Sequence, residues 1–159
     1  MKKSILILSL VTLIGCTKTN VPDGFPKLVS VTLTFVQEGT PLSGAVVSLS
    51  GDCQFSVGGM TDANGLVVLH THGQYKGAPL GKFKVRVVKT ESDSVPPAPK
   101  LGTPEYATYM EEVRKRPPPK TYTLIEKQYT RTETTPLELD ITGSMTQTLD
   151  IGKAVKDPI

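Results

Sequence analysis

Alternation of apolar and polar residues is the clearest pattern in this chain. Residues 29–35 (Val-Ser-Val-Thr-Leu-Thr-Phe) place apolar side chains at odd positions and hydroxyl side chains at even ones. A period of two puts the two sets on opposite faces of a strand, so this segment predicts a half-buried β-strand. The same pattern recurs at 45–49 and 82–88, where the expected inward residues are Ala45, Val47, Leu49, Phe83, Val85 and Val87.

Further strands are predicted at 55–59, 66–71, 137–141 and 146–151. The sharpest turn is Asp62-Ala63-Asn64-Gly65, because Asn and Gly tolerate positive φ and Asp can bond the backbone two residues on. It should join 57–61 to 66–71 as a hairpin. Short strands separated by frequent turns indicate one all-β sandwich of about seven strands over residues 29–152.

Residues 90–122 depart from this pattern and predict an insertion. Prolines gather near both of its ends, at 96, 97, 99 and 117–119. Between them, Thr103 is a candidate N-cap and Pro104 a candidate first helical residue, with 105–116 as the helix body. The basic run 114–116 at its end suits the helix dipole. We therefore expect one short helix in a long loop packed on or beside the sandwich.

The first sixteen residues have the anatomy of an export signal. Lys2 and Lys3 precede an apolar run of about ten residues, too short to span a bilayer, which takes about 20 residues as a helix. Leu-Ile-Gly15-Cys16 resembles the lipobox of bacterial lipoproteins, in which a small residue precedes a cysteine. The resemblance implies removal of residues 1–15 by cleavage between Gly15 and Cys16, transfer of a diacylglycerol to the Cys16 thiol, and acylation of the new N-terminus, with fatty acids such as palmitate.

Two or three acyl chains, at about 0.8 kcal/mol per buried methylene, would anchor the chain stably to a membrane. Thr17, where an aspartate would favour the inner membrane, favours the outer membrane of a bacterial cell envelope. Residues 16–28 are polar and interrupted by proline, which predicts a tether, and 153–159 are expected to be a C-terminal tail. An ordinary secretory signal with an incidental cysteine is the alternative.

The domain resembles carboxypeptidase regulatory-like domains, which have a transthyretin-like (prealbumin-like, Ig-like) sandwich. The resemblance rests on Gly-Thr-Pro-Leu-Ser-Gly-Ala-Val-Val at 39–47, Thr-Asp-Ala-Asn-Gly at 61–65 and 77–85. Leu80 stands where the family often has proline, and Phe83 where it often has tyrosine. Segments 125–129 and 134–137 are similar to small planctomycete-type lipoproteins, without their usual proline after Ile125.

The composition excludes some classes of function but does not indicate a particular one. The net charge is +3, of which two units belong to Lys2 and Lys3, and no basic stripe with interleaved aromatics is present. We therefore expect no nucleic-acid partner. With Cys16 assigned to lipid, Cys53 is a lone thiol, and a structural role for it is favoured over a reactive one.

No catalytic, metal or cofactor site is predicted. His70 and His72 would share a strand face, but a third ligand is missing and Val67, Leu69 and Thr71 form the more plausible inward face. Asp62 and Asn64 lack the further acidic ligands of a calcium loop. The C-terminal Tyr-Arg-Gly-Ser of the transthyretin-like hydroxyisourate hydrolases is also absent.

The favoured function is a non-enzymatic, lipid-anchored envelope module with a structural or protein-interaction role, using strand edges and the insertion as contact surfaces. The alternative is a carbohydrate- or peptide-binding module of an uptake or degradation system. Stacking on glycans would use the tyrosines at 75, 106, 109, 122 and 129, although tyrosines that close the ends of a sandwich are the simpler interpretation. An enzyme of unknown type is a third, less favoured possibility.

Overall fold

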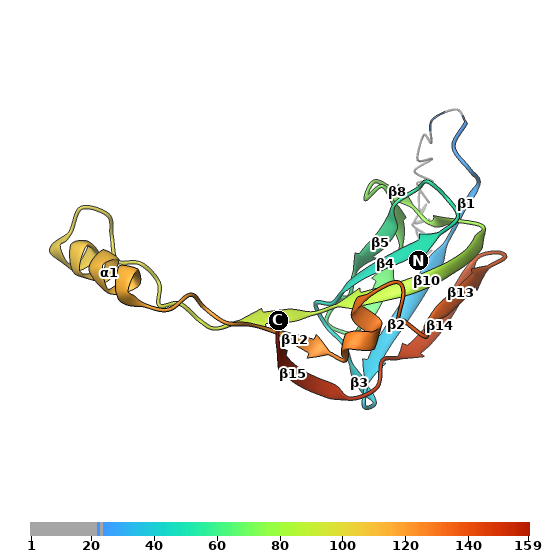
Figure 1. The fold of residues 1–159 in the computed structure, drawn as a ribbon. Helices are drawn as coiled ribbons and strands as arrows, with labels where there is room; N and C mark the ends of the chain where they lie inside the picture. Colours follow the sequence, from blue (N-terminus) through green and yellow to red (C-terminus); the bar gives the residue numbers. More distant parts are fainter. Residues whose placement is uncertain (1–21, 23) are drawn as a thin grey trace, which may run out of the picture.

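The computed structural model describes residue 22 and residues 24–159, and its fold is the expected all-β sandwich (Figure 1). Six of the seven strands predicted from the sequence are present within a few residues of the expected bounds, and the seventh, 66–71, is divided into two. The residues of the expected signal peptide, 1–15, and of the expected lipidation site, Gly15 and Cys16, lie outside the described residues.

The larger sheet contains six strands, and its neighbours are antiparallel. Their order across the sheet is β13 (Glu138–Ile141), β10 (Gly81–Val88), β4 (Val46–Gly51), β5 (Val57–Met60), β7 (His70–Thr71) and β8 (Tyr75–Lys76). Two shorter strands, β1 (Leu28–Val29) and β9 (Ala78–Pro79), pair separately beside it.

The smaller sheet is built around β2 (Val31–Gln37). β3 (Thr40–Pro41) and β6 (Leu66–Val68) lie antiparallel along one side of it, and β14 (Met145–Asp150) lies parallel along the other. The parallel register runs from Val31 opposite Met145 to Val36 opposite Asp150. This sheet therefore joins β2, near the start of the described chain, to β14, near its end.

The core lies between the two sheets and follows the alternation in the sequence. Every expected inward residue of 45–49 and 82–88 is buried, and the buried residues of β2 are Val31, Leu33 and Phe35. At about 1.5–3 kcal/mol for each large apolar side chain removed from water, this core is the main favourable term in folding.

Residues 66–71 form two strands in two sheets instead of one. β6 pairs with β2 and β7 pairs with β5, with the buried Leu69 between them. The expected hairpin is therefore only half correct, because its second strand crosses to the other sheet. The turn itself matches the prediction: Asp62 Oδ1 accepts hydrogen bonds from the backbone N–H of Asn64 (2.8 Å) and Leu66 (2.9 Å), and Gly65 has φ +72°.

Residues 90–122, which we call the arm, project from the sandwich (Figure 1). The base of the arm is an antiparallel pair, β11 (Thr90–Ser92) and β12 (Thr121–Ile125), and α1 (Pro104–Lys115) lies at its far end. The helix was predicted correctly, but its packing against the sandwich was not. No residue of α1 is buried, so the helix has no face that the sandwich covers.

The expectation of a C-terminal tail at 153–159 is also wrong. Residues Ala154–Pro158 form β15, which pairs antiparallel with β12, and Ile159 N–H donates to Thr121 O (3.0 Å). The reason is that β12 would otherwise present a bare edge opposite β11. A 3-10 helix, η1 (Lys127–Thr130), follows β12 and lies over β10.

Candidate functional site

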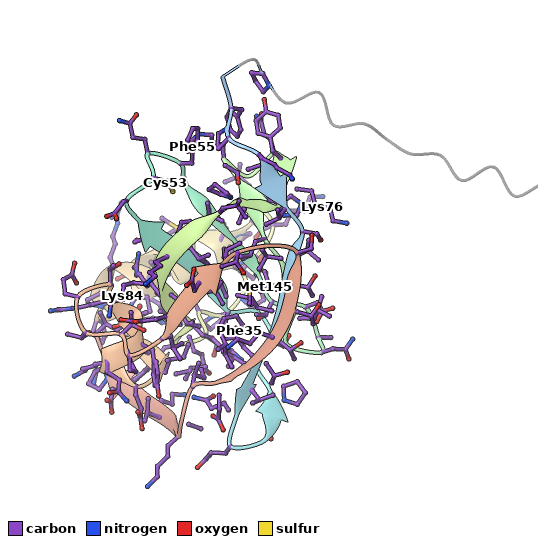
Figure 2. The ribbon with its side chains drawn as sticks, turned by 90° about the vertical axis from the view of Figure 1, so that its right-hand side faces the viewer. Phe35, Cys53, Phe55, Lys76, Lys84 and Met145 are labelled. Carbon is purple, nitrogen blue, oxygen red and sulfur yellow. The ribbon has the colours of Figure 1, made fainter. Side chains whose placement is uncertain are left out.

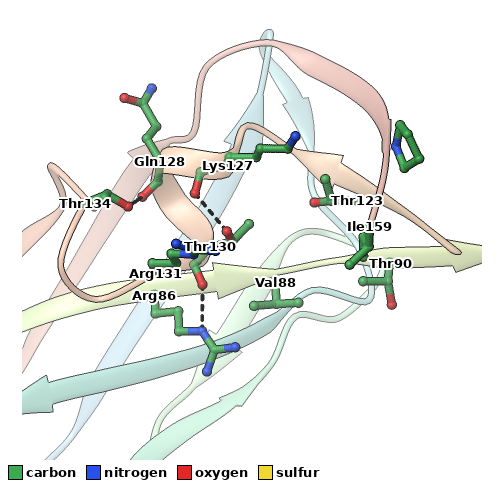
Figure 3. Close-up of a pocket in the computed structure, with 11 residues that line it drawn as sticks. Arg86, Val88, Thr90, Thr123, Lys127, Gln128, Thr130, Arg131, Thr134 and Ile159 are labelled. Atoms are coloured by element: carbon green, nitrogen blue, oxygen red, sulfur yellow. Dashed lines mark hydrogen bonds between the residues drawn. The ribbon is translucent and has the colours of Figure 1, made fainter.

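A groove of about 610 Å³ lies between β10, η1 and the end of β15 (Figure 3). Val88 and Ile159 give it an apolar wall, and Thr90 and Thr123 add hydroxyl groups. Its charged lining residues are Arg86, Lys127 and Arg131. We call this the basic groove, because no Asp or Glu side chain of the described residues lines it.

The cationic side chains of the basic groove have hydrogen-bond donors that are not used by other described residues. Arg86 Nε donates to the carbonyl of Thr130 (2.9 Å), which fixes the guanidinium and leaves its terminal nitrogens for other acceptors (Figure 3). Among residues 24–159, none of the three cations belongs to an ion pair. A fixed guanidinium beside further cations can bind a carboxylate or phosphate in a bidentate manner.

The wall of the groove that η1 forms is held by Tyr129. Its ring is buried, with 8% of the residue exposed, and burial raises the pKa of its hydroxyl, with smaller contributions from the charges of Glu126 and Asp150. Thr130 Oγ1 also donates to Lys127 O (2.8 Å). The backbone that carries Lys127 and Arg131 is therefore anchored to the core.

α1 and the segments beside it present apolar side chains that the described residues do not cover. Leu101 just before it is 76% exposed, Met110 is 36% exposed, and Val95 in the adjoining segment is 52% exposed. The helix is held in place locally. The Thr103 hydroxyl accepts from Tyr106 N–H (3.3 Å), and Tyr109 Oη donates to Pro96 O (3.1 Å).

The outer edge of β14 is open. Met145 N–H donates to Ser30 O and Ile151 N–H to Val36 O, both at 3.0 Å. The backbone N–H and C=O groups of the odd-numbered residues therefore point toward β2, and those of the even-numbered residues point toward the open edge. Residues 145–149 carry no charge and no proline, whereas β3 and β15 each contain proline and β13 is acidic. Apart from Asp150 at its end, β14 thus lacks the charges and prolines that usually protect an edge strand.

The structure does not bring His70 and His72 into a ligand set. Both lie outside the core as expected: His70 Nδ1 is 3.0 Å from Val68 O, and His72 is exposed with φ +53°. Within residues 24–159, no group of three His, Cys, Asp or Glu residues is placed to hold a metal ion. Cys53 is half-buried at the rim of the core, and its thiol lies 3.7 Å from Phe55 O.

The five tyrosines do not form one platform. Tyr129 is buried, Tyr106 and Tyr109 belong to α1, and Tyr122 on β12 lies under the Lys156 ammonium, 5.0 Å from the ring centroid. The interpretation that tyrosines would stack together on a glycan therefore has no support in their arrangement.

Tyr75 belongs to a cluster that the sequence did not reveal, which we call the aromatic end. The Phe25 ring centroid lies 4.8 Å from that of Phe55, 4.9 Å from that of Tyr75 and 5.8 Å from that of His72. These residues come from separate segments, so no local spacing could have indicated them. Phe25 also lies in the stretch that the sequence assigns to the tether.

Comparisons with protein-family models, curated proteins and solved structures found no match to this chain. None of the helices in the described part of the chain has the length and apolar character needed to cross a membrane.

Proposed function

We propose that this chain is a lipid-anchored module of the bacterial cell envelope, without enzymatic activity, whose role is to hold or contact another envelope protein. The anchor rests on the leader and its lipobox-like Gly15-Cys16. The transthyretin-like, carboxypeptidase regulatory-like relationship and the outer-membrane location are parts of the same proposal.

The arm is the observation that carries the interaction role. A segment of this length carries a large cost in conformational entropy, and none of α1 contributes to the core. Loops longer than about 12–15 residues in compact domains are usually functional or disordered. This one is ordered by a capped helix and a closed base, and it presents Leu101 and Met110 to solvent.

Lipidation is tested in the bacterium by labelling with palmitate. The full chain should incorporate the label and remain with membranes, and Cys16→Ser should lose the label and release the domain. Cys53→Ser is the matched control and should remain labelled. A labelled Cys16→Ser chain would contradict the anchor.

The contact role of the arm is tested with a photo-crosslinking residue at Met110 in the full chain. We expect a discrete crosslinked product that disappears when Leu101→Asp is added. Val46, an apolar residue on the sandwich that is more exposed than Met110 (48% against 36%), is the control position. Equal crosslinking from both positions, or a product unaffected by Leu101→Asp, would argue against the arm as the contact.

The basic groove favours a second candidate function, the binding of an anionic glycan or peptide. A guanidinium fixed by Thr130 O and two further cations around a groove of about 610 Å³ suit a sugar or peptide with a carboxylate or phosphate. Titration with peptidoglycan fragments should show binding that weakens about tenfold or more in Arg86→Gln with Arg131→Gln, as expected when charge-assisted hydrogen bonds are lost. Lys120→Gln, outside the groove, should bind as the unmodified chain does.

A further inference from the structure

The aromatic end lies where the described chain enters the sandwich. Phe25 precedes β1, and its ring packs against Phe55 before β5 and Tyr75 in β8. Phe25, Phe55 and Tyr75 are half-buried, and His72 is exposed. Figure 2 shows Phe55 and Lys76 toward one end of the domain. The cluster thus fixes the place at which the tether joins the domain.

The backbone is shaped to support this arrangement. His72 adopts φ +53°, a region that L-residues rarely enter, and its N–H donates to Ser56 O (2.7 Å). In this conformation the His72 ring lies edge-on to Phe25 and to Phe55, whose centroid is 5.5 Å away. The loops that join short strands are therefore tied together by aromatic contacts.

The composition of this end suits a lipid headgroup layer. Aromatic rings favour the membrane–water interface, and lysines can reach from there to lipid phosphates. Lys27 and Lys76 are exposed and follow Phe25 and Tyr75 closely in the chain, while Asp52 is the acidic residue in the loop that carries Phe55. Asp23, two residues before Phe25, and Asp52 equal these two lysines in number, so the aromatic rings and not a net charge favour the headgroup layer.

The length of the tether supports the same assignment. Phe25 is nine residues after Cys16, and an extended chain spans at most about 3.3–3.6 Å per residue, so the tether reaches about 30 Å at full extension. A flexible chain of this length is usually much shorter, about 5–6 Å times the square root of the residue number. A lipid on Cys16 would hold the aromatic end at the bilayer surface.

We propose that the aromatic end rests against the headgroups of the bilayer that holds the Cys16 lipid, so that the domain has one fixed membrane-facing side. This inference rests on the proposed lipidation of Cys16. It goes further, because a tether alone would leave the domain free to turn. It leaves the arm, which departs from another part of the sandwich, available to a partner (Figure 1).

The chain contains no tryptophan, so one introduced residue becomes an unambiguous fluorescent reporter. The full lipidated chain carrying Phe25→Trp would be placed in phosphatidylethanolamine–phosphatidylglycerol vesicles whose acyl chains are brominated near the headgroup. We expect blue-shifted emission that falls by about half relative to unbrominated vesicles, as for an aromatic ring at the interface. The control is Tyr109→Trp on α1, whose emission should not change.

Tyr75→Trp provides a second reporter if Phe25→Trp disturbs the fold, which far-UV circular dichroism would reveal. A chain that incorporates palmitate but shows no quenching from either reporter would overturn the inference and leave the anchor intact. Equal quenching of Tyr109→Trp would also overturn it, because the domain would then have no fixed side. A chain without palmitate would overturn the anchor itself, and the inference with it.

Discussion

The sandwich and the arm are built from the same chain by different means. The sandwich buries continuous sets of apolar side chains from both sheets, whereas α1 in the arm buries none. Around α1 the interactions are local: a Thr103 cap and two exposed ion pairs, Glu111 with Lys115 (2.8 Å) and Glu112 with Arg116 (3.0 Å). Exposed ion pairs of this kind contribute about 0.3–0.5 kcal/mol each.

The amino acids of the two regions are therefore subject to different constraints. In the sandwich, residue identity is set by packing, because a missing methylene leaves a cavity. In the arm, exposed residues such as Leu101 contribute little to folding and are free to suit a partner. Global stability and the order of the arm should therefore respond to different substitutions.

The largest contrast is expected from the same substitution made in both regions. Leu33→Ala, at a position with no exposed surface, should lower the free energy of unfolding by about 2–5 kcal/mol because it leaves a cavity. Leu101→Ala in the arm should change it by less than about 0.5 kcal/mol. Urea unfolding measures both, and similar losses would show that the arm is part of the cooperative core.

An intermediate effect is expected at the helix cap. Thr103→Ala removes the acceptor for Tyr106 N–H and should cost about 1 kcal/mol of helix stability. Hydrogen exchange should quicken in residues 104–115 and stay unchanged in β10. Thr103→Ser retains the hydroxyl and is the matched control, and faster exchange in β10 would show that the arm and sandwich are coupled.

One carboxyl group in each region, Glu105 in the arm and Glu138 in the sandwich, makes the stability of that region depend on pH. Hydrogen bonds from its own backbone and from Thr103 lower the pKa of Glu105, and the hydrogen bond and charge of Lys84 lower the pKa of Glu138. A folded-state pKa below the unfolded one gives stability that is present above the unfolded pKa, about 4.3, and is lost as pH falls through the folded pKa. Both effects should therefore disappear in acid.

The pH contrast can be resolved residue by residue by NMR titration. Lys84→Met should raise the pKa of Glu138 toward its ordinary value and leave that of Glu105 unchanged. Thr103→Ala should raise the pKa of Glu105 alone. A change in both carboxyl groups in either variant would contradict the independence of the two regions.

The smallest effect is expected from removing the arm. Ser92 pairs with Thr121, so replacing residues 93–120 by Asn-Gly should close β11 and β12 as a two-residue hairpin. The deletion removes no core contact, and closing the shorter loop costs less conformational entropy. The free energy of unfolding should therefore not fall. Urea unfolding checks this, and a clear loss would assign the arm a structural role.

The sequence predicts local structure well here because each strand has its own period of two. Phe83, Val85 and Val87 are buried as their alternation indicates, and Thr103 caps α1. It does not predict which strands pair. The crossing at Leu69 and the use of 154–158 as a strand depend on partners distant in the chain, which no local pattern encodes.

The candidate sites were predictable only where the signal is local. Asp62 was correctly assigned to a turn. The basic groove combines Arg86 with residues of η1, and the aromatic end combines Phe25 with residues of two other segments, around 55 and 72–75. Such sites exist only after the sheets have formed, because cations and rings scattered along the chain have no spacing that marks them as neighbours.

The parallel pairing of β2 with β14 also governs how the chain reaches this fold. Val31 must meet Met145 across most of the sequence, and such non-local pairing is slow because loop-closure entropy is lost before the contacts form. Until β14 arrives, β2 has a free edge beside Leu33 and Phe35, in a segment rich in β-formers and without charge over residues 28–36. The unfinished chain is therefore expected to be prone to aggregation and to depend on a holding chaperone, whereas in the finished domain β2 is paired along both edges and Val31, Leu33 and Phe35 are buried.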